Sequence, residues 1–160
     1  MKHVTFKGGP PVMGEGVVLN ADPLMLDIDA VSKNRFRIPI KHGVVIGKDC
    51  DFGANVVINK GTLSDTIIGD NVFIGHNSII GHDCKIGNHV LIGAGVIICG
   101  HVTLGDYTHV AVGSIVLPNL LIGKNVFIGA GSLVNRSIAQ DNVIAYGSPC
   151  NVVRDNKWRP

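Results

Sequence analysis

The sequence predicts an all-β solenoid, and a six-residue repeat, the glycines within it and the composition support this. From Ile68 onward every sixth residue is aliphatic: Ile68, Ile74, Ile80, Ile86, Ile92, Ile98, Leu104, Val110, Val116, Ile122, Ile128 and Val134. Most of these are followed directly by glycine. Apolar residues make up 46% of the chain and aromatic residues only 5%, which fits a core of stacked aliphatic side chains.

Side-chain alternation explains the repeat. In a strand, residues two apart share a face, so each aliphatic residue and the small or β-branched residue two before it point the same way. The following glycine can turn without a Cβ clash. Six residues are too few for a strand and a hairpin, and the period is not helical. Short strands joined by corners therefore predict stacked coils that bury each other's inner row.

The pattern Ile-Gly-x-x-small-x resembles the hexapeptide-repeat acyltransferases over roughly residues 40 to 154. This resemblance implies a left-handed parallel β-helix with three sides. Three parts are expected: an irregular N-terminal cap over residues 1–37, the β-helix over residues 38–146, and a C-terminal tail over residues 147–160. The step from Ile58 to Ile68 is ten residues, so a loop insertion is expected near residues 60–66.

Composition and charge narrow the functional classes. A net charge of +2 gives no reason to expect nucleic acid or an anionic membrane as a partner. The sequence has no apolar run long enough to span a bilayer and no signal-peptide pattern near Met1. The four cysteines lack CxxC spacing, so reduced thiols in a cytoplasmic protein are expected.

On a three-sided coil, residues 18 apart stack on one face. One outward column is then apolar throughout, comprising Ile79, Ile97, Ile115 and Leu133. Such a column is unusual on a solvated surface and predicts an interface. The resemblance implies that this interface forms a homotrimer.

The same 18-residue stacking places His82 and Asp83 at the corner where the apolar face ends. The segment from Ile80 to Gly87 resembles the catalytic histidine segment of sialic-acid and bacillosamine-type sugar acetyltransferases, and of the lipid A enzyme that N-acylates UDP-sugars. The resemblance implies acyl transfer from a thioester to an amine or hydroxyl, with His82 as general base and Asp83 as its orienting partner. It assigns oxyanion stabilisation to the backbone N–H of Gly100.

Further site residues are expected from position and resemblance. Substrate contacts are expected at His76, His101 and Asn119. Contacts to coenzyme A, with acetyl-CoA as the expected acyl donor, are expected at Gly113, Ala130, Gly131 and Arg154. No metal is expected. A small-molecule acceptor, a sugar or sugar nucleotide, completes the expected reaction.

Three alternatives remain at this point. An N-acyltransferase that uses an acyl-carrier protein would share the fold and the histidine. A γ-carbonic-anhydrase-like metalloenzyme would need three histidines on zinc, and no histidine pair here has the five-residue spacing of its second and third ligands. A structural solenoid without catalytic function would not require His82 beside Asp83.

Overall fold

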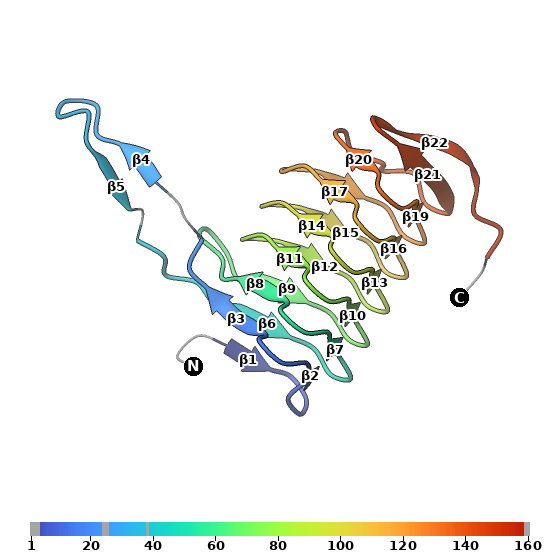
Figure 1. Ribbon diagram of the computed structural model, residues 1–160, viewed down its shortest axis with the longest axis horizontal. Helices are drawn as coiled ribbons and strands as arrows, with labels where there is room; N and C mark the ends of the chain where they lie inside the picture. The colour runs from blue at the N-terminus through green and yellow to red at the C-terminus, as the bar shows by residue number, and fades with distance from the viewer. Residues whose placement is uncertain (1–3, 24–25, 38, 159–160) are drawn as a thin grey trace.

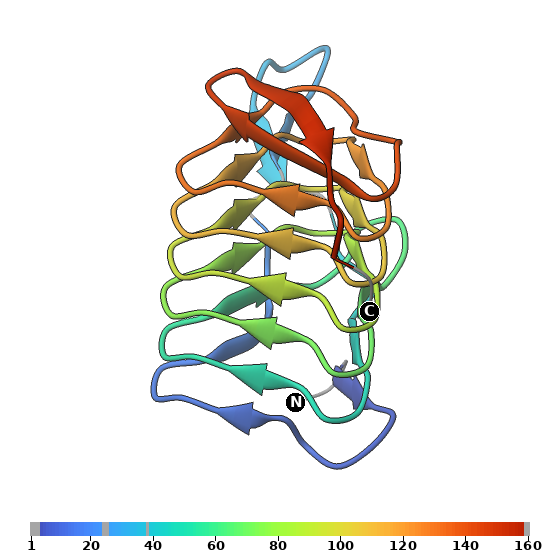
Figure 2. The same ribbon diagram turned by 90° about the vertical axis from the view of Figure 1, so that its right-hand side faces the viewer.

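In a computed structural model, the chain forms a left-handed parallel β-helix, which confirms the predicted fold class (Figures 1 and 2). The structure describes residues 4–23, 26–37 and 39–158, with only the backbone for residues 26–28. Three sheets run along the solenoid, one on each side, and their strands are parallel except for the last strand of one sheet. We name them sheets A, B and C in the order in which the chain enters them.

The strands of each sheet follow in stacking order. Sheet A contains β1 (Val4–Phe6), β6 (Val44–Ile46), β9 (Thr66–Ile68), β12 (Lys85–Ile86), β15 (Thr103–Leu104) and β18 (Leu121–Ile122). Sheet B contains β2 (Val12–Met13), β7 (Asp51–Phe52), β10 (Phe73–Ile74), β13 (Leu91–Ile92), β16 (His109–Val110), β19 (Phe127–Ile128), β21 (Val143–Gly147) and β22 (Cys150–Asp155). Sheet C contains β3 (Val18–Ala21), β8 (Val57–Asn59), β11 (Ile79–Ile80), β14 (Ile97–Ile98), β17 (Ile115–Val116) and β20 (Leu133–Val134).

The strand register confirms a three-sided coil of 18 residues. In sheet C, Ile79 pairs with Ile97, and Ile97 pairs with Ile115. In sheet A, Lys85 pairs with Thr103 in the same way. Residues 18 apart therefore lie directly above one another, as the repeat predicts.

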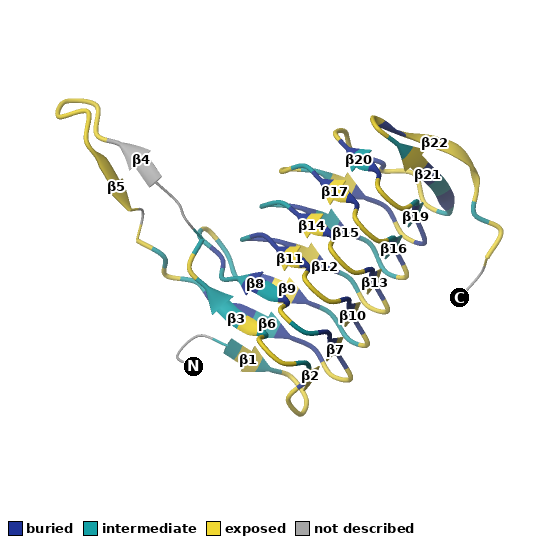
Figure 3. Cartoon of the chain, viewed as in Figure 1, coloured by how far each residue is buried: buried dark blue, intermediate teal, exposed yellow. Residues whose placement is uncertain are grey.

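The core is the inner row of the repeat (Figure 3). Ile68, Ile92 and Ile98 are at most 1% exposed, and each such isoleucine contributes roughly 1.5–3 kcal/mol by its burial. The small inner residues include hydroxyls, which bond to the backbone of the next coil. Ser78 Oγ, for example, donates to the Gly93 carbonyl at 2.9 Å. The buried Ser78 hydroxyl is thereby satisfied.

The N-terminal region differs from the irregular cap expected over residues 1–37. Strands β1, β2 and β3 pair in parallel with β6, β7 and β8, so residues 4–21 form a first coil of the solenoid. The inner row of this coil consists of Phe6, Met13 and Leu19. The step from Phe6 to Met13 is seven residues instead of six, so the repeat is hard to see in the sequence. Residue 38, where the repeat was expected to begin, lies outside the described residues.

Between the first and second coils the chain leaves the solenoid. Strands β4 (Leu26–Ile28) and β5 (Arg35–Arg37) pair antiparallel in a hairpin that projects beyond the stacked coils (Figure 1). The other end of the solenoid is covered by β22, which runs antiparallel to β21. Throughout the described residues we find no helix long and apolar enough to cross a bilayer.

Candidate active site

The candidate site lies on the C–A corner, where strands of sheet C lead into sheet A. In successive coils this corner carries the insertion, then His82 and Asp83, then Gly100 and His101. Asp83 has a φ of 58°, in the left-handed region. This tight turn brings two consecutive side chains together, and His82 Nδ1 lies 2.7 Å from Asp83 Oδ2. An extended strand would point these side chains to opposite faces.

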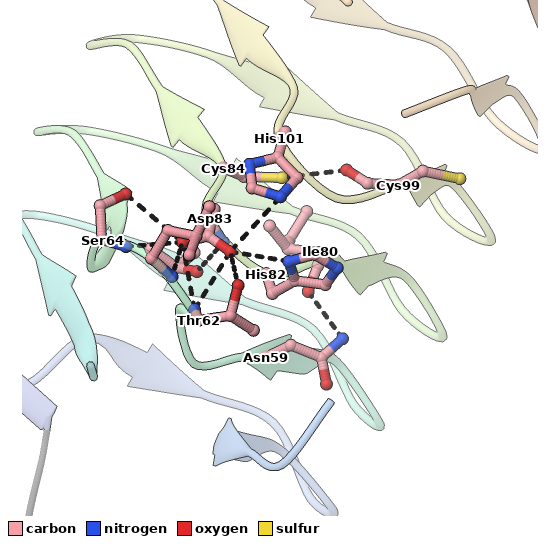
Figure 4. A network of polar contacts seen from close by, with 11 residues as sticks. Asn59, Thr62, Ser64, Ile80, His82, Asp83, Cys84, Cys99 and His101 are labelled. Carbon is pink, nitrogen blue, oxygen red and sulfur yellow. Dashed lines mark hydrogen bonds and ion pairs between the residues drawn. The ribbon is translucent and has the colours of Figure 1, made fainter. Parts of the chain in front are cut away.

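Asp83 is a buried carboxylate surrounded by donors (Figure 4). Its side chain is 2% exposed. The insertion supplies the backbone N–H groups of Thr62, Leu63 and Ser64, at 2.7–3.1 Å, and the hydroxyls of Thr62 and Ser64, at 2.5 and 3.4 Å. Burial by itself would raise the pKa of Asp83. The hydrogen bonds from Thr62, His82, Ser64 and Leu63 outweigh it and hold that pKa well below its usual value.

The hydrogen bond to Asp83 defines the chemistry of the His82 ring. An ionised carboxylate can only accept, so Nδ1 carries the hydrogen and the neutral ring has its lone pair on Nε2. The side chain is 18% exposed, so the ring is reachable from outside. A Cβ added at Gly100 would lie 2.6 Å from Nε2, which explains why this position holds glycine. Among the described residues, the Gly100 N–H has no acceptor.

His101 and Asn119 continue the same corner. His101 Nε2 lies 3.7 Å from Asp83 Oδ2, and its ring stands edge-on to His82 with centroids 5.0 Å apart. Asn119 is exposed, and its backbone N–H donates to the Gly100 carbonyl at 3.1 Å. Three residues expected at the site, Asp83, Gly100 and His101, therefore lie beside the predicted base, and Asn119 lies one coil further along the same corner.

The other expected residues lie elsewhere. His76, Gly113, Ala130 and Gly131 occupy the B–C corner, at the opposite edge of sheet C. His76 Nδ1 accepts the Ala54 N–H at 2.8 Å and so supports the corner of the preceding coil. Nothing lies within 4 Å of a Cβ placed on Gly113 or Gly131, which leaves that backbone open.

Arg154 is on β22, at the end of sheet B, with its side chain exposed. In this chain, Gly113, Ala130 and Gly131 are separated from His82 by the width of sheet C. The substrate and cofactor roles of these residues stay predictions.

The cluster of His82, Asp83 and His101 has the residue types of a metal site, with one ligand atom from each within 4.8 Å of the others. Its carboxylate does not suit that role. Both Asp83 oxygens already accept hydrogen bonds from the insertion, and a cation at Oδ2 would compete with Thr62 and His82. The geometry favours a hydrogen-bonded dyad over a metal centre.

Sequence reasoning missed the residues that hold Asp83. Thr66 is fully buried, and its Oγ1 accepts the Asp83 N–H at 2.9 Å, which fixes the corner backbone. Thr62 and Ser64 come from the insertion, whose conformation the repeat does not define. The ten-residue step together with a Gly-Thr-Leu-Ser run was the available signal.

Family models place the chain among hexapeptide proteins. The model described as "Bacterial transferase hexapeptide (six repeats)" matches residues 65–100. The model described as "Hexapeptide repeat of succinyl-transferase" matches residues 40–62, 84–118 and 120–139. Together the two models cover more than half of the chain. UDP-3-O-acylglucosamine N-acyltransferase from Xanthomonas campestris is 37% identical over 70 residues, which is 44% of this chain and 20% of that protein.

Solved structures agree on the fold. UDP-N-acetylglucosamine acyltransferase from Bacteroides fragilis is similar with a TM-score of 0.82 at 22% identity, covering 96% of this chain and 57% of that one. The Francisella novicida enzyme of the same name has a TM-score of 0.79 at 25% identity, covering 96% and 56%. PerB from Caulobacter crescentus, in complex with CoA and GDP-perosamine, has a TM-score of 0.59 at 26% identity, covering 94% and 58%. The chain thus spans a fifth of its curated relative and somewhat over half of these structures.

Proposed function

The chain belongs to the hexapeptide-repeat transferase family, and on that premise we propose that it is an acyltransferase in which His82 acts as general base. The observation that carries this proposal is the His82–Asp83 dyad. A buried carboxylate orients the ring through Nδ1 and leaves Nε2 to accept a proton. A purely structural corner needs neither the ionised carboxylate nor the partly exposed ring.

The reaction follows from these groups. The acceptor nucleophile attacks the thioester carbonyl while its proton passes to His82 Nε2. The negative charge that develops on the carbonyl oxygen is stabilised by the Gly100 N–H. The carbon–sulfur bond then breaks, and the departing thiolate takes the proton from the imidazolium. Asp83 stabilises that cation and keeps the ring in place.

The relatives suggest the substrates. The N-acyltransferase from Xanthomonas is named for a UDP-linked acylated glucosamine, and PerB was crystallised with CoA and GDP-perosamine. We therefore propose a sugar or sugar nucleotide as acceptor and acetyl-CoA as donor. The open backbone at Gly113 and Gly131 suits the approach of an extended donor such as pantetheine. A donor bound to an acyl-carrier protein is the second candidate, because the relatives of this chain include acyltransferases that use donors of that type.

We propose a homotrimer packed through sheet C, whose outward face carries an apolar column. Ile79, Ile97 and Ile115 are exposed in one column, and Val57 and Leu133 extend it. This column is bounded on one side by the corner that holds His82 and on the other by the corner that holds Gly113. A neighbouring copy packed on sheet C would bring the base of one subunit near the donor residues of the next.

Thiol release from acetyl-CoA, measured with a panel of amino sugars and nucleotide-linked amino sugars, tests the function. We expect acceptor-dependent release that falls by about 10²–10⁴ in His82→Ala, with the oligomer unchanged. Near-normal turnover in that variant would remove His82 as the base. Acyl-carrier-protein thioesters tested in parallel separate the two donors, and metal analysis of the active protein tests the γ-carbonic-anhydrase-like alternative.

A further inference from the structure

The insertion between β8 and β9 makes more contacts with Asp83 than any other corner loop described makes with a carboxylate. At the neighbouring A–B corner, Asp70 and Asp106 each accept one backbone N–H from the preceding coil, at 3.0 and 2.9 Å. Asp83 instead accepts three backbone N–H groups and two hydroxyls from residues 62–64. Resting on the proposed function, we infer that this loop fixes the catalytic dyad and that Thr62 is a positioning residue for His82.

The loop is itself held in a defined shape. A Cβ on Gly61 would lie 1.5 Å from the Ser64 carbonyl oxygen, so the turn closes only with glycine at this position. The N–H groups of Gly61 and Thr66 both donate to the Gly43 carbonyl at 3.1 Å. An ion pair between Lys60 and Asp22 anchors its start. The donors are therefore oriented before any substrate arrives, which is how a preorganised site works.

Thr62 differs from the other loop donors in the oxygen it holds. Its hydroxyl donates at 2.5 Å to Oδ2, the atom that also accepts from His82 Nδ1 at 2.7 Å. Leu63 and Ser64 bind Oδ1 instead. Thr62 therefore holds the direction of Asp83 Oδ2, and this oxygen in turn orients the His82 ring. Without this hydroxyl, the only loop group left on Oδ2 would be the Thr62 backbone N–H, which lies 3.1 Å from both carboxylate oxygens. The hydroxyl is the shorter bond and the one made to Oδ2 alone, so its loss should loosen the direction of that oxygen.

Two substitutions isolate the hydroxyl. Thr62→Val keeps the shape and removes the donor, and Thr62→Ser keeps the donor. We expect kcat to fall about 10- to 100-fold in Thr62→Val with KM for the donor unchanged, and to recover in Thr62→Ser. Thr5→Val is the matched control, because it makes the same change at an exposed threonine on β1 in the first coil, and it should stay within about twofold of the parent protein.

A double-mutant cycle shows whether Thr62 acts through Asp83. In an Asp83→Asn background, Thr62→Val should cause little further loss of kcat, because the oxygen it aims has gone. A full additional loss would overturn the inference, as would an unchanged kcat in the single variant.

The ¹⁵N shifts of the His82 ring, measured without substrate, give a readout independent of turnover. We expect the Nδ1–H form in the parent protein and Thr62→Ser, and a mixture of forms in Thr62→Val. If the parent protein transfers no acyl group from any donor, the proposed function fails, and these shifts still decide the positioning role. A parent-like ring in Thr62→Val would overturn that role.

Discussion

The substitution Asp83→Asn keeps the shape of the Asp83 side chain and removes the negative charge that orients His82. The amide oxygen can take the place of Oδ1 and accept from Leu63 and Ser64, at positions that hold 2.8 and 2.7 Å bonds in the parent. The amide nitrogen then occupies the place of Oδ2, opposite His82 Nδ1. An NH₂ group donates, so it selects the ring form with its hydrogen on Nε2. That form cannot take a proton from the acceptor.

The size of the effect follows from the role that is lost. General-base catalysis contributes about 10²–10⁴ in rate, equivalent to roughly 3–5 kcal/mol of transition-state stabilisation. We expect kcat to fall by that factor while KM for the donor stays near its parent value. The variant also loses hydrogen bonds to an ionised carboxylate. We therefore expect its free energy of unfolding to fall by on the order of 1.5–3 kcal/mol.

The assay is thiol release at saturating donor, with the unfolding midpoint measured on the same preparation. Asp106→Asn is the matched control, because Asp106 is a partly exposed corner carboxylate that bonds Asn88 and Lys124 on a different corner. It should keep parent kcat. An Asp83→Asn enzyme within about threefold of the parent would refute the dyad, because a base with the wrong tautomer cannot sustain that rate.

Three further predictions concern the interface, the thiols and acid stability. Ile97→Glu should dissociate the oligomer, measured as solution mass, and an unchanged mass would exclude sheet C as the interface. Cys84→Ala should retain parent turnover, because burial raises the pKa of the Cys84 thiol to about 12 and no acyl-cysteine is needed; loss of turnover with intact fold would contradict direct transfer. The folded-state pKa of Asp83 lies below its unfolded value, so unfolding takes up a proton and stability should decline as pH drops below about 4. Urea midpoints across that range should fall less in Asp83→Asn, and identical slopes in the two proteins would contradict the assignment.

The repeat could predict everything that depends on side-chain period. Ile68, Ile92 and Ile98 are buried and Ile97 is exposed because alternation in a strand fixes inside and outside. The same period predicted that His82 and Asp83 share a corner, and that an extra loop lies near residue 60.

What the period could not predict is how irregular segments pack. The donors of Thr62 and Ser64 reach Asp83 only because the insertion folds back over the corner, and this depends on the tight approach of Gly61 to Ser64. The first coil escaped notice for a related reason. Its pairing with the second coil spans a 22-residue excursion that includes a hairpin, so no local spacing links the two.

The left-handed turns at the corners have a wider consequence. Apart from glycine, asparagine, aspartate and histidine tolerate positive φ best, and the corners of this chain use them repeatedly, as at Asn77, Asp83, His101 and Asn119. Backbone geometry alone thus places residues that can bind or transfer protons at the corners of such a β-helix. A new catalytic centre can therefore arise at the corner of almost any coil without a change in the fold. What sets one rung apart is a loop that shields its carboxylate from water.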